Sequence, residues 1–150
     1  SEWPADPGTV AAETWAEAQD LIYLGGGNPV QLVESLKGNG LGRALVRASH
    51  AGTVLVGVSA GAMCWAEAFL WRDAAGTLGV ARGLGAIAGS ITPHATTEPD
   101  RIDRMRALVA RGALPGGVAI DDGAALVFRH GEPSETFAPD GLPGLHHIPG

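Results

Sequence analysis

The junction between Thr53 and Phe69, TVLVGVSAGAMCWAEAF, constrains the fold more than any other stretch of the chain. Thr53 to Val58 is a continuous run of mostly β-branched residues, which predicts a parallel strand buried on both faces. From Ala60 to Leu70 helix-forming residues take over and predict a helix. Because a buried strand that passes directly into a helix is the basic unit of α/β proteins, we expect the chain to belong to that class.

The same alternation recurs along the whole chain. Glycine clusters separate the segments, as at Gly25-Gly26-Gly27 and Gly38-Asn39-Gly40. We therefore predict an α/β fold with a mostly parallel sheet and a single domain over residues 1–150, without a linker. The other predicted helices cover residues 9–20, 29–37, 41–49 and 98–111, and the other predicted strands cover 21–24, 89–92 and 117–120, followed by a hairpin of 124–128 with 135–138.

The composition narrows the classes of partner. The 150 residues are 45% hydrophobic and carry a formal net charge of -6, which favours a folded core and disfavours a surface that must neutralise phosphates. We expect a small-molecule or peptide partner, no nucleic acid and no membrane. Cys64 is the only cysteine, so an intrachain disulfide and a cysteine-based zinc site are excluded. The opening SEWPADPGTV lacks the charged start and apolar core of a signal peptide, and we expect a cytoplasmic location.

Gly57-Val58-Ser59-Ala60-Gly61 matches G-x-S-x-G, the nucleophile elbow, in its required context of a strand before and a helix after. The glycines permit a sharp turn that exposes the serine hydroxyl over a helix N-terminus. The backbone N–H of Ala60, directly after the serine, is the natural oxyanion donor. The plainer interpretation is a small residue in a tight turn.

A nucleophilic serine needs a histidine to accept its proton and an acid to orient that histidine. Among the five histidines, His94 alone directly follows a predicted strand, in SITPH, and would emerge at the carboxyl edge of the sheet. For the acid, Glu67 and Asp73 both lie between Ser59 and His94 in the chain. Glu67 is predicted two turns along the helix that follows Ser59, and Asp73 in the loop beyond it. The residues alone do not choose between the two carboxylates.

Two further segments carry candidate site residues. LGGGN, from Leu24 to Asn28, follows a strand and precedes a helix. It suggests a second anion-binding loop facing Ser59, a nucleotide phosphate loop, or a glycine-rich helix entry without a ligand. Asp121 and Asp122 resemble a metal pair, but adjacent residues of a strand point to opposite faces. We predict a turn that lines the pocket, with no metal and no cofactor.

Four segments together resemble the dipeptidase E (aspartyl dipeptidase) family of serine peptidases, which also contains the cyanophycinases. They are LIYLGGGNPVQLV (21–33), VGVSAGAMCW (56–65), SITPH (90–94) and AIDDGAAL (119–126), in the order and spacing of the family. The resemblance implies a three-layer sandwich related to class I glutamine amidotransferases. It also implies a Ser-His-acid triad and hydrolysis of peptides that begin with aspartate.

Residue roles follow from the resemblance by position. It makes Ser59 the nucleophile, His94 the base, and Gly27 with Ala60 the oxyanion donors. It favours Asp73 over Glu67 as the acid, although a W-x-E segment such as Trp65-Ala66-Glu67 keeps the glutamate in contention. For substrate binding it indicates Arg101, with Arg104 behind it, and Asn28; an arginine suits this role because it pairs with a carboxylate through two hydrogen bonds.

The family also has a βαβα part ahead of the glycine loop, and this chain begins just before that loop. The resemblance therefore implies a longer chain or a second subunit over the exposed sheet edge, and we expect a homodimer. The leading functional hypothesis is a serine exopeptidase of small peptides, possible substrates being Asp-X dipeptides, acting through an acyl-enzyme. The alternatives are an esterase or other acyl hydrolase with the same elbow, and a non-catalytic homologue that acts as a binding module.

Overall fold

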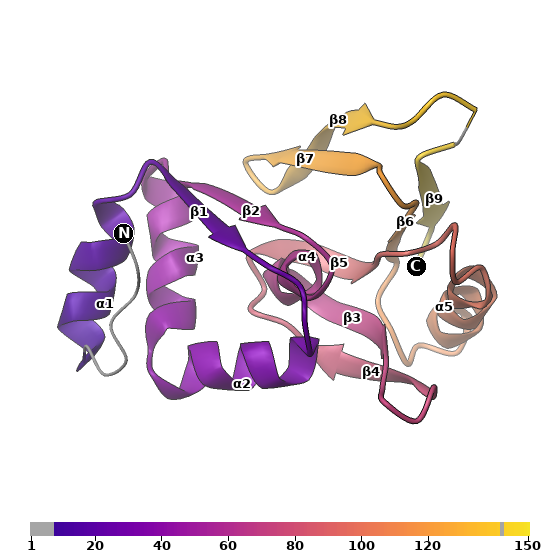
Figure 1. The fold of residues 1–150 in the computed structure, drawn as a ribbon, viewed down its shortest axis with the longest axis horizontal. Helices are drawn as coiled ribbons and strands as arrows, with labels where there is room; N and C mark the ends of the chain where they lie inside the picture. The colour runs from indigo at the N-terminus through magenta and orange to yellow at the C-terminus, as the bar shows by residue number, and fades with distance from the viewer. Residues whose placement is uncertain (1–7, 142) are drawn as a thin grey trace.

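The computed structural model describes residues 8–141 and 143–150, so most of SEWPADPGTV, which is predicted not to be a signal peptide, lies outside the described residues. The fold is α/β, as predicted, and Figure 1 shows the arrangement of its elements. In chain order they are α1 (Gly8–Glu17), β1 (Leu21–Leu24), α2 (Pro29–Gly38), α3 (Leu41–Ala51), β2 (Val54–Gly57), α4 (Ala60–Trp65), β3 (Ala66–Arg72), β4 (Leu78–Arg82), β5 (Ile87–Thr92), α5 (Asp100–Ala110), β6 (Gly117–Ile120), β7 (Ala125–Arg129), β8 (Glu132–Phe137) and β9 (Leu145–Ile148).

Strands β1 and β2 form a parallel pair, with Leu21 opposite Val54 and Leu24 opposite Gly57. One side of the pair faces a core that α1 to α4 share, where Ile22 packs with the buried Leu45 and Phe69. Both strands run toward the same edge, so the glycine loop after β1 and Ser59 after β2 lie next to each other.

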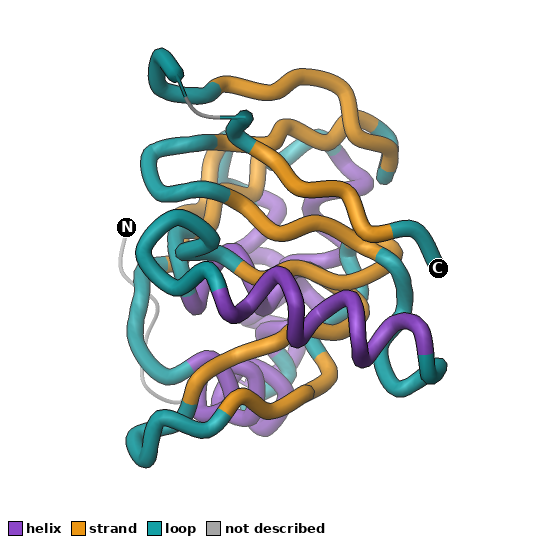
Figure 2. The backbone as a smooth tube through the Cα atoms, turned by 90° about the vertical axis from the view of Figure 1, so that its right-hand side faces the viewer, coloured by secondary structure: helices purple, strands orange, loops and turns teal. Residues whose placement is uncertain are grey.

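The five-stranded sheet has the order β4-β3-β5-β6-β9. Its three central strands, β3, β5 and β6, are parallel, and the two outer strands are antiparallel to their neighbours. Helix α5 covers one face, where Met105 and Leu108 pack with Leu70, and Figure 2 shows this helix in front of the strands. Leu126 and Phe128 of the β7–β8 hairpin pack on the other face. The mostly parallel sheet is confirmed.

The predicted helix over 60–70 is wrong in its second half. Helix α4 ends at Trp65, Ala66 is extended with ψ 163°, and the chain continues as strand β3. Strand β3 pairs with β4 on one side and β5 on the other, which buries Phe69 and Leu70 completely. Pairing on both sides outweighs the modest helix preference of Ala66-Glu67-Ala68. Strands β4 and β9 were not predicted.

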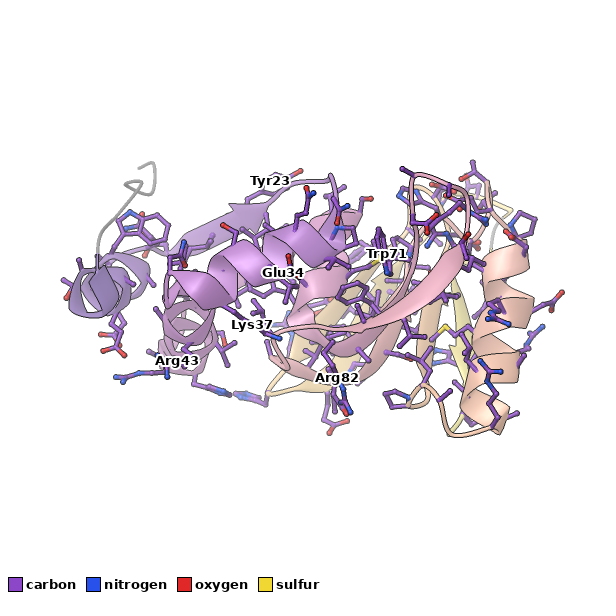
Figure 3. All side chains as sticks on the ribbon, turned by 90° about the horizontal axis from the view of Figure 1, so that it is seen from below. Tyr23, Glu34, Lys37, Arg43, Trp71 and Arg82 are labelled. Atoms are coloured by element: carbon purple, nitrogen blue, oxygen red, sulfur yellow. The ribbon has the colours of Figure 1, made fainter. Side chains whose placement is uncertain are left out.

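One face of the β1–β2 pair is open, contrary to the predicted strand buried on both faces. Leu21, Tyr23 and Val54 are each more than half exposed, and Tyr23 projects from β1 in Figure 3. Large exposed apolar patches are found at the contact surfaces of proteins. The expected homodimer, with a second copy on such a face, stays a prediction. None of the helices described in the structure combines the length and apolarity that a membrane span requires.

Candidate active site

Ser59 occupies the sharp turn between β2 and α4. Its backbone has φ 54° and ψ -113°, in a region that non-glycine residues rarely adopt. Strain of this kind costs about 1–3 kcal/mol and persists only where the surroundings enforce it. The half-buried side chain therefore stands on a fixed backbone at the edge of the sheet.

The two glycines of the elbow are required by close backbone contacts. A Cβ added to Gly57 would lie 2.3 Å from the carbonyl oxygen of Gly61, and one added to Gly61 would lie 2.1 Å from that of Leu24. Both distances are far below van der Waals contact. The N–H of Gly61 donates to the carbonyl of Gly25 at 3.0 Å, so the elbow is joined directly to the glycine loop.

The glycine loop lies against the serine. A Cβ built on Gly26 would sit 3.6 Å from the Ser59 Cβ, and Gly27 has φ 133°, a conformation that side chains disfavour. Asn28 ends the loop, and its Oδ1 accepts from the N–H groups of Val30 and Gln31 at the start of α2. Asn28 is thus a helix cap, and its contact with a substrate stays a prediction.

His94 meets Ser59 from the neighbouring sheet. It follows β5 by two residues, and its Nε2 lies 2.9 Å from Ser59 Oγ. Its backbone is also in the left-handed region, at φ 64°. The N–H of Glu98 donates to the His94 carbonyl, and the N–H of Ala95 donates to Ile120 at the end of β6. These bonds fix the loop that carries the imidazole.

The carboxylate at the other imidazole nitrogen is that of Asp122, a residue predicted only to lie in a pocket-lining turn. His94 Nδ1 lies 2.8 Å from Asp122 Oδ1. Asp122 follows β6 by two residues, just as His94 follows β5, and the two strands are parallel neighbours. Parallel strands bring their carboxyl ends to one edge, which is why residues 28 apart in the chain meet here.

Neither predicted acid contacts His94, and this corrects the assignment of Asp73 or Glu67. Because the chain leaves the helix at Trp65, Glu67 lies in β3, where it pairs with Arg82 of β4 at 2.8 Å. Asp73 stays within the turn from β3 to β4, and its Oδ1 accepts from the N–H groups of two turn residues. Each carboxylate has a local structural partner away from the imidazole.

The protonation states follow from the geometry. The hydrogen bond with His94, together with two from Thr97, holds the pKa of Asp122 below its ordinary value despite opposition from burial. An ionised carboxylate only accepts hydrogen bonds, so the proton of a neutral His94 ring is on Nδ1. Its Nε2 is then an acceptor for the Ser59 hydroxyl. Hydrogen bonds thus run from Ser59 through His94 to Asp122, an arrangement whose geometry can carry a proton away from a serine hydroxyl.

Arg101 has a structural position, contrary to the prediction that it binds substrate. Its side chain is only 5% exposed and donates to the carboxylate of Glu98, to the carbonyl of Leu70 and to the Thr92 hydroxyl. Glu98 also pairs with Arg72 at 2.5 Å. The guanidinium therefore ties α5 to β3 and β5, and it is not free to take a substrate carboxylate.

Cys64 is a possible rival nucleophile, and Asp121 with Asp122 is a possible metal pair. Cys64 is buried in α4, its thiol donates to the carbonyl of Gly61, and burial raises its pKa to about 12. A thiol in that state is not a rival nucleophile. Asp121 and Asp122 point to different histidines, and no cluster of three metal-binding side chains occurs within residues 8–141 and 143–150.

Acid is expected to destabilise the fold through these two aspartates. The pKa of Asp121 is lowered as well: burial acts to raise it, but the hydrogen bonds from His146 and Thr96 outweigh that effect. A lowered pKa stabilises the fold fully above the ordinary value of 3.8, and that stabilisation is lost as the pH falls through the folded-state pKa. The free energy of unfolding measured with urea should therefore decrease as the pH falls below about 4, and it should decrease less steeply in Asp121→Asn. Parallel curves for the two proteins would contradict this assignment.

The sequence profile of Peptidase family S51 matches residues 9–135, a span that contains Ser59, His94 and Asp122. The chain belongs to Peptidase family S51. A curated relative, the uncharacterized peptidase YgaJ of Bacillus subtilis (strain 168), is 41% identical over 119 residues. That match covers 79% of this chain and 51% of the relative, so the chain spans about half the length of that relative. The resemblance to the dipeptidase E family is thereby confirmed.

Two solved structures share the fold of this chain. A putative peptidase E protein from Listeria monocytogenes EGD-e superposes with a TM-score of 0.64 at 23% identity, over 91% of this chain and 68% of that one. A peptidase from an acI-B1 Actinobacterium gives 0.66 at 20% identity, over 95% and 59%. These likenesses show the fold, and they match the α/β class predicted from the sequence.

Proposed function

We propose that this chain carries the catalytic centre of a serine exopeptidase that hydrolyses small peptides through an acyl-enzyme. The observation that carries the proposal is the unbroken chain of hydrogen bonds from Ser59 Oγ to His94 at 2.9 Å and from His94 to Asp122 at 2.8 Å. Membership of a peptidase family supports the same chemistry.

In the proposed reaction Ser59 Oγ attacks the scissile carbonyl and its proton passes to His94 Nε2. Asp122 stabilises the imidazolium that forms. The backbone N–H groups of Ala60 and Gly27 are the proposed oxyanion donors, one from each side of the serine. His94 returns the proton to the leaving amine, and a water molecule, deprotonated by the same imidazole, then releases the acid product and restores the serine.

Asp-X dipeptides are the proposed first substrates. Arg101 does not support this preference because its guanidinium is occupied within the fold. A panel of Asp-X, Glu-X and Ala-X dipeptides therefore belongs in the first assay. Equal turnover of all three would retain the peptidase and end the aspartate preference.

A fluorophosphonate probe tests the proposed centre without assuming a substrate. We expect the probe to label Ser59, located by peptide mass spectrometry, and His94→Ala to slow labelling about 10²-fold or more because an unactivated serine is a poor nucleophile. A wild-type chain that is not labelled, or labelling that is indifferent to His94, would overturn the proposal. Labelling with ester turnover but no peptide turnover would assign an acyl hydrolase instead.

A further inference from the structure

The two adjacent aspartates at the end of β6 have separate partners. Asp122 is bound to His94, and its second oxygen, Oδ2, accepts from the N–H of Thr97 at 3.0 Å and from the Thr97 hydroxyl at 2.9 Å. Asp121 points away from this pair, and its side chain is only 4% exposed. Burying a carboxylate costs free energy unless its oxygens are hydrogen-bonded, so the partners of Asp121 show what keeps it in this position.

Asp121 joins the end of β6 to two segments that are distant in the chain, the loop after β5 and the segment 144–146. Its Oδ1 accepts from the Thr96 hydroxyl at 2.9 Å and from His146 Nε2 at 3.0 Å, and its Oδ2 accepts from the N–H of Gly144 at 3.1 Å. Because the carboxylate only accepts, the proton of His146 in this contact lies on Nε2. His146 is on β9, which pairs with β6 in register Ala119 to His146. The final strand thus reaches the back of the candidate active site.

The Thr96 hydroxyl is the link between Asp121 and the proposed catalytic acid. It donates to Asp121 Oδ1 and accepts from the backbone N–H of Asp122 at 3.3 Å. Thr96 also lies two residues after His94, in the same loop. One hydroxyl therefore connects the loop of the base with the backbone of the acid, and the buried Asp121 holds that hydroxyl in place.

We propose that Thr96, Asp121 and His146 are positioning residues that keep His94 and Asp122 in hydrogen-bonding register, an inference that rests on the proposed function for its catalytic effect. None of the three touches Ser59 or a reacting atom in this arrangement. Their effect is on geometry, to which proton transfer between Ser59 and His94 is sensitive: small misplacements can cost about 10²-fold in rate.

The test uses Thr96→Val, which keeps the shape of the side chain and removes the hydroxyl. We expect kcat, or the first-order rate of fluorophosphonate labelling at saturation, to fall about 10- to 100-fold with little change in KM. Thr96→Ser should restore most of the rate. Thr136→Val, an exposed threonine on β8, is the matched control and should behave as wild type. A Thr96→Val rate within twofold of wild type would overturn the proposal.

A second readout does not depend on catalysis. The proton between His94 Nδ1 and Asp122 should give a downfield resonance in the wild-type NMR spectrum, and Thr96→Val should broaden or remove it. His146→Phe should do the same, whereas His146→Gln, which keeps an N–H donor toward Asp121, should preserve it. An unchanged resonance in Thr96→Val and His146→Phe would refute the positioning role even in an inactive protein. If the probe does not label the wild-type protein and the resonance is present and responds to the variants as expected, the proposed function is refuted and the positioning role is retained.

Discussion

Asp122→Asn is expected to lower kcat by about 10⁴-fold while leaving the fold intact. The carboxylate accepts the Nδ1 proton of His94 at 2.8 Å, and a carboxamide can present its NH₂ there instead. The ring would then favour the tautomer with its proton on Nε2, the nitrogen that must accept the proton of Ser59. In a Ser-His-Asp triad this change costs about 10⁴ in kcat. Turnover of the best dipeptide, or the rate of fluorophosphonate labelling, measures it.

Asp73→Asn and Glu67→Gln are the matched controls for this experiment. Both remove one negative charge from a residue that family resemblance had favoured as the acid. Asparagine keeps the oxygen that accepts from the turn after β3, and Glu67 pairs with Arg82 at the surface, so both variants should retain rates within about threefold of wild type. A loss of activity in Asp73→Asn with an active Asp122→Asn would reverse the assignment made from the geometry.

Arg101→Met is expected to lower the free energy of unfolding by about 3 kcal/mol. Removal of the guanidinium takes away a buried donor to the Leu70 carbonyl and the Thr92 hydroxyl, which remain bonded to each other, and it leaves Glu98 with Arg72 alone. Breaking a buried pair by removing one partner is among the most destabilising substitutions known. Urea unfolding at neutral pH measures the change.

Arg104→Met separates this structural role from substrate binding. Arg104 lies on the same helix and is exposed, so its replacement should change stability by less than about 0.5 kcal/mol. Below the unfolding transition, Arg101→Met should retain the wild-type KM for Asp-X relative to Ala-X dipeptides. A selective rise in KM for Asp-X with unchanged stability would restore Arg101 as a substrate ligand.

The sequence predicted best those features that depend on local signals. Strands 21–24 and 117–120 have the predicted bounds because β-branched or apolar runs end there at glycine or aspartate. The elbow at Ser59 is recognisable because its strand, its G-x-S-x-G turn and its helix are contiguous in the sequence, although the contact that requires Gly61 comes from Leu24 of the neighbouring strand. The helix over 60–70 failed because strand pairing with β4 and β5, which the local sequence does not report, decided the conformation of residues 66–70.

The acid could not be found by the same means. Asp122 meets His94 only because β5 and β6 are neighbours in the sheet, and strand order is a property of the whole fold. One signal was available: both residues stand two positions after a predicted parallel strand. Successive side chains of a strand point to opposite faces, which argues against a shared metal at Asp121 and Asp122. The same rule implies that the two carboxylates point in different directions, and that of Asp122 points toward the His94 imidazole.

Alkylation of Cys64 can be used to measure local opening of the region around Ser59. Its thiol lies in α4, the helix that begins beside the serine, and it is fully buried with a pKa of about 12. An alkylating reagent therefore meets a covered and protonated sulfur while α4 is in place, and the reaction waits for that helix to open. Because the sequence holds a single cysteine, the mass of one added alkyl group identifies reaction at Cys64 alone. The rate of that addition in native buffer reports how readily α4 opens beside Ser59.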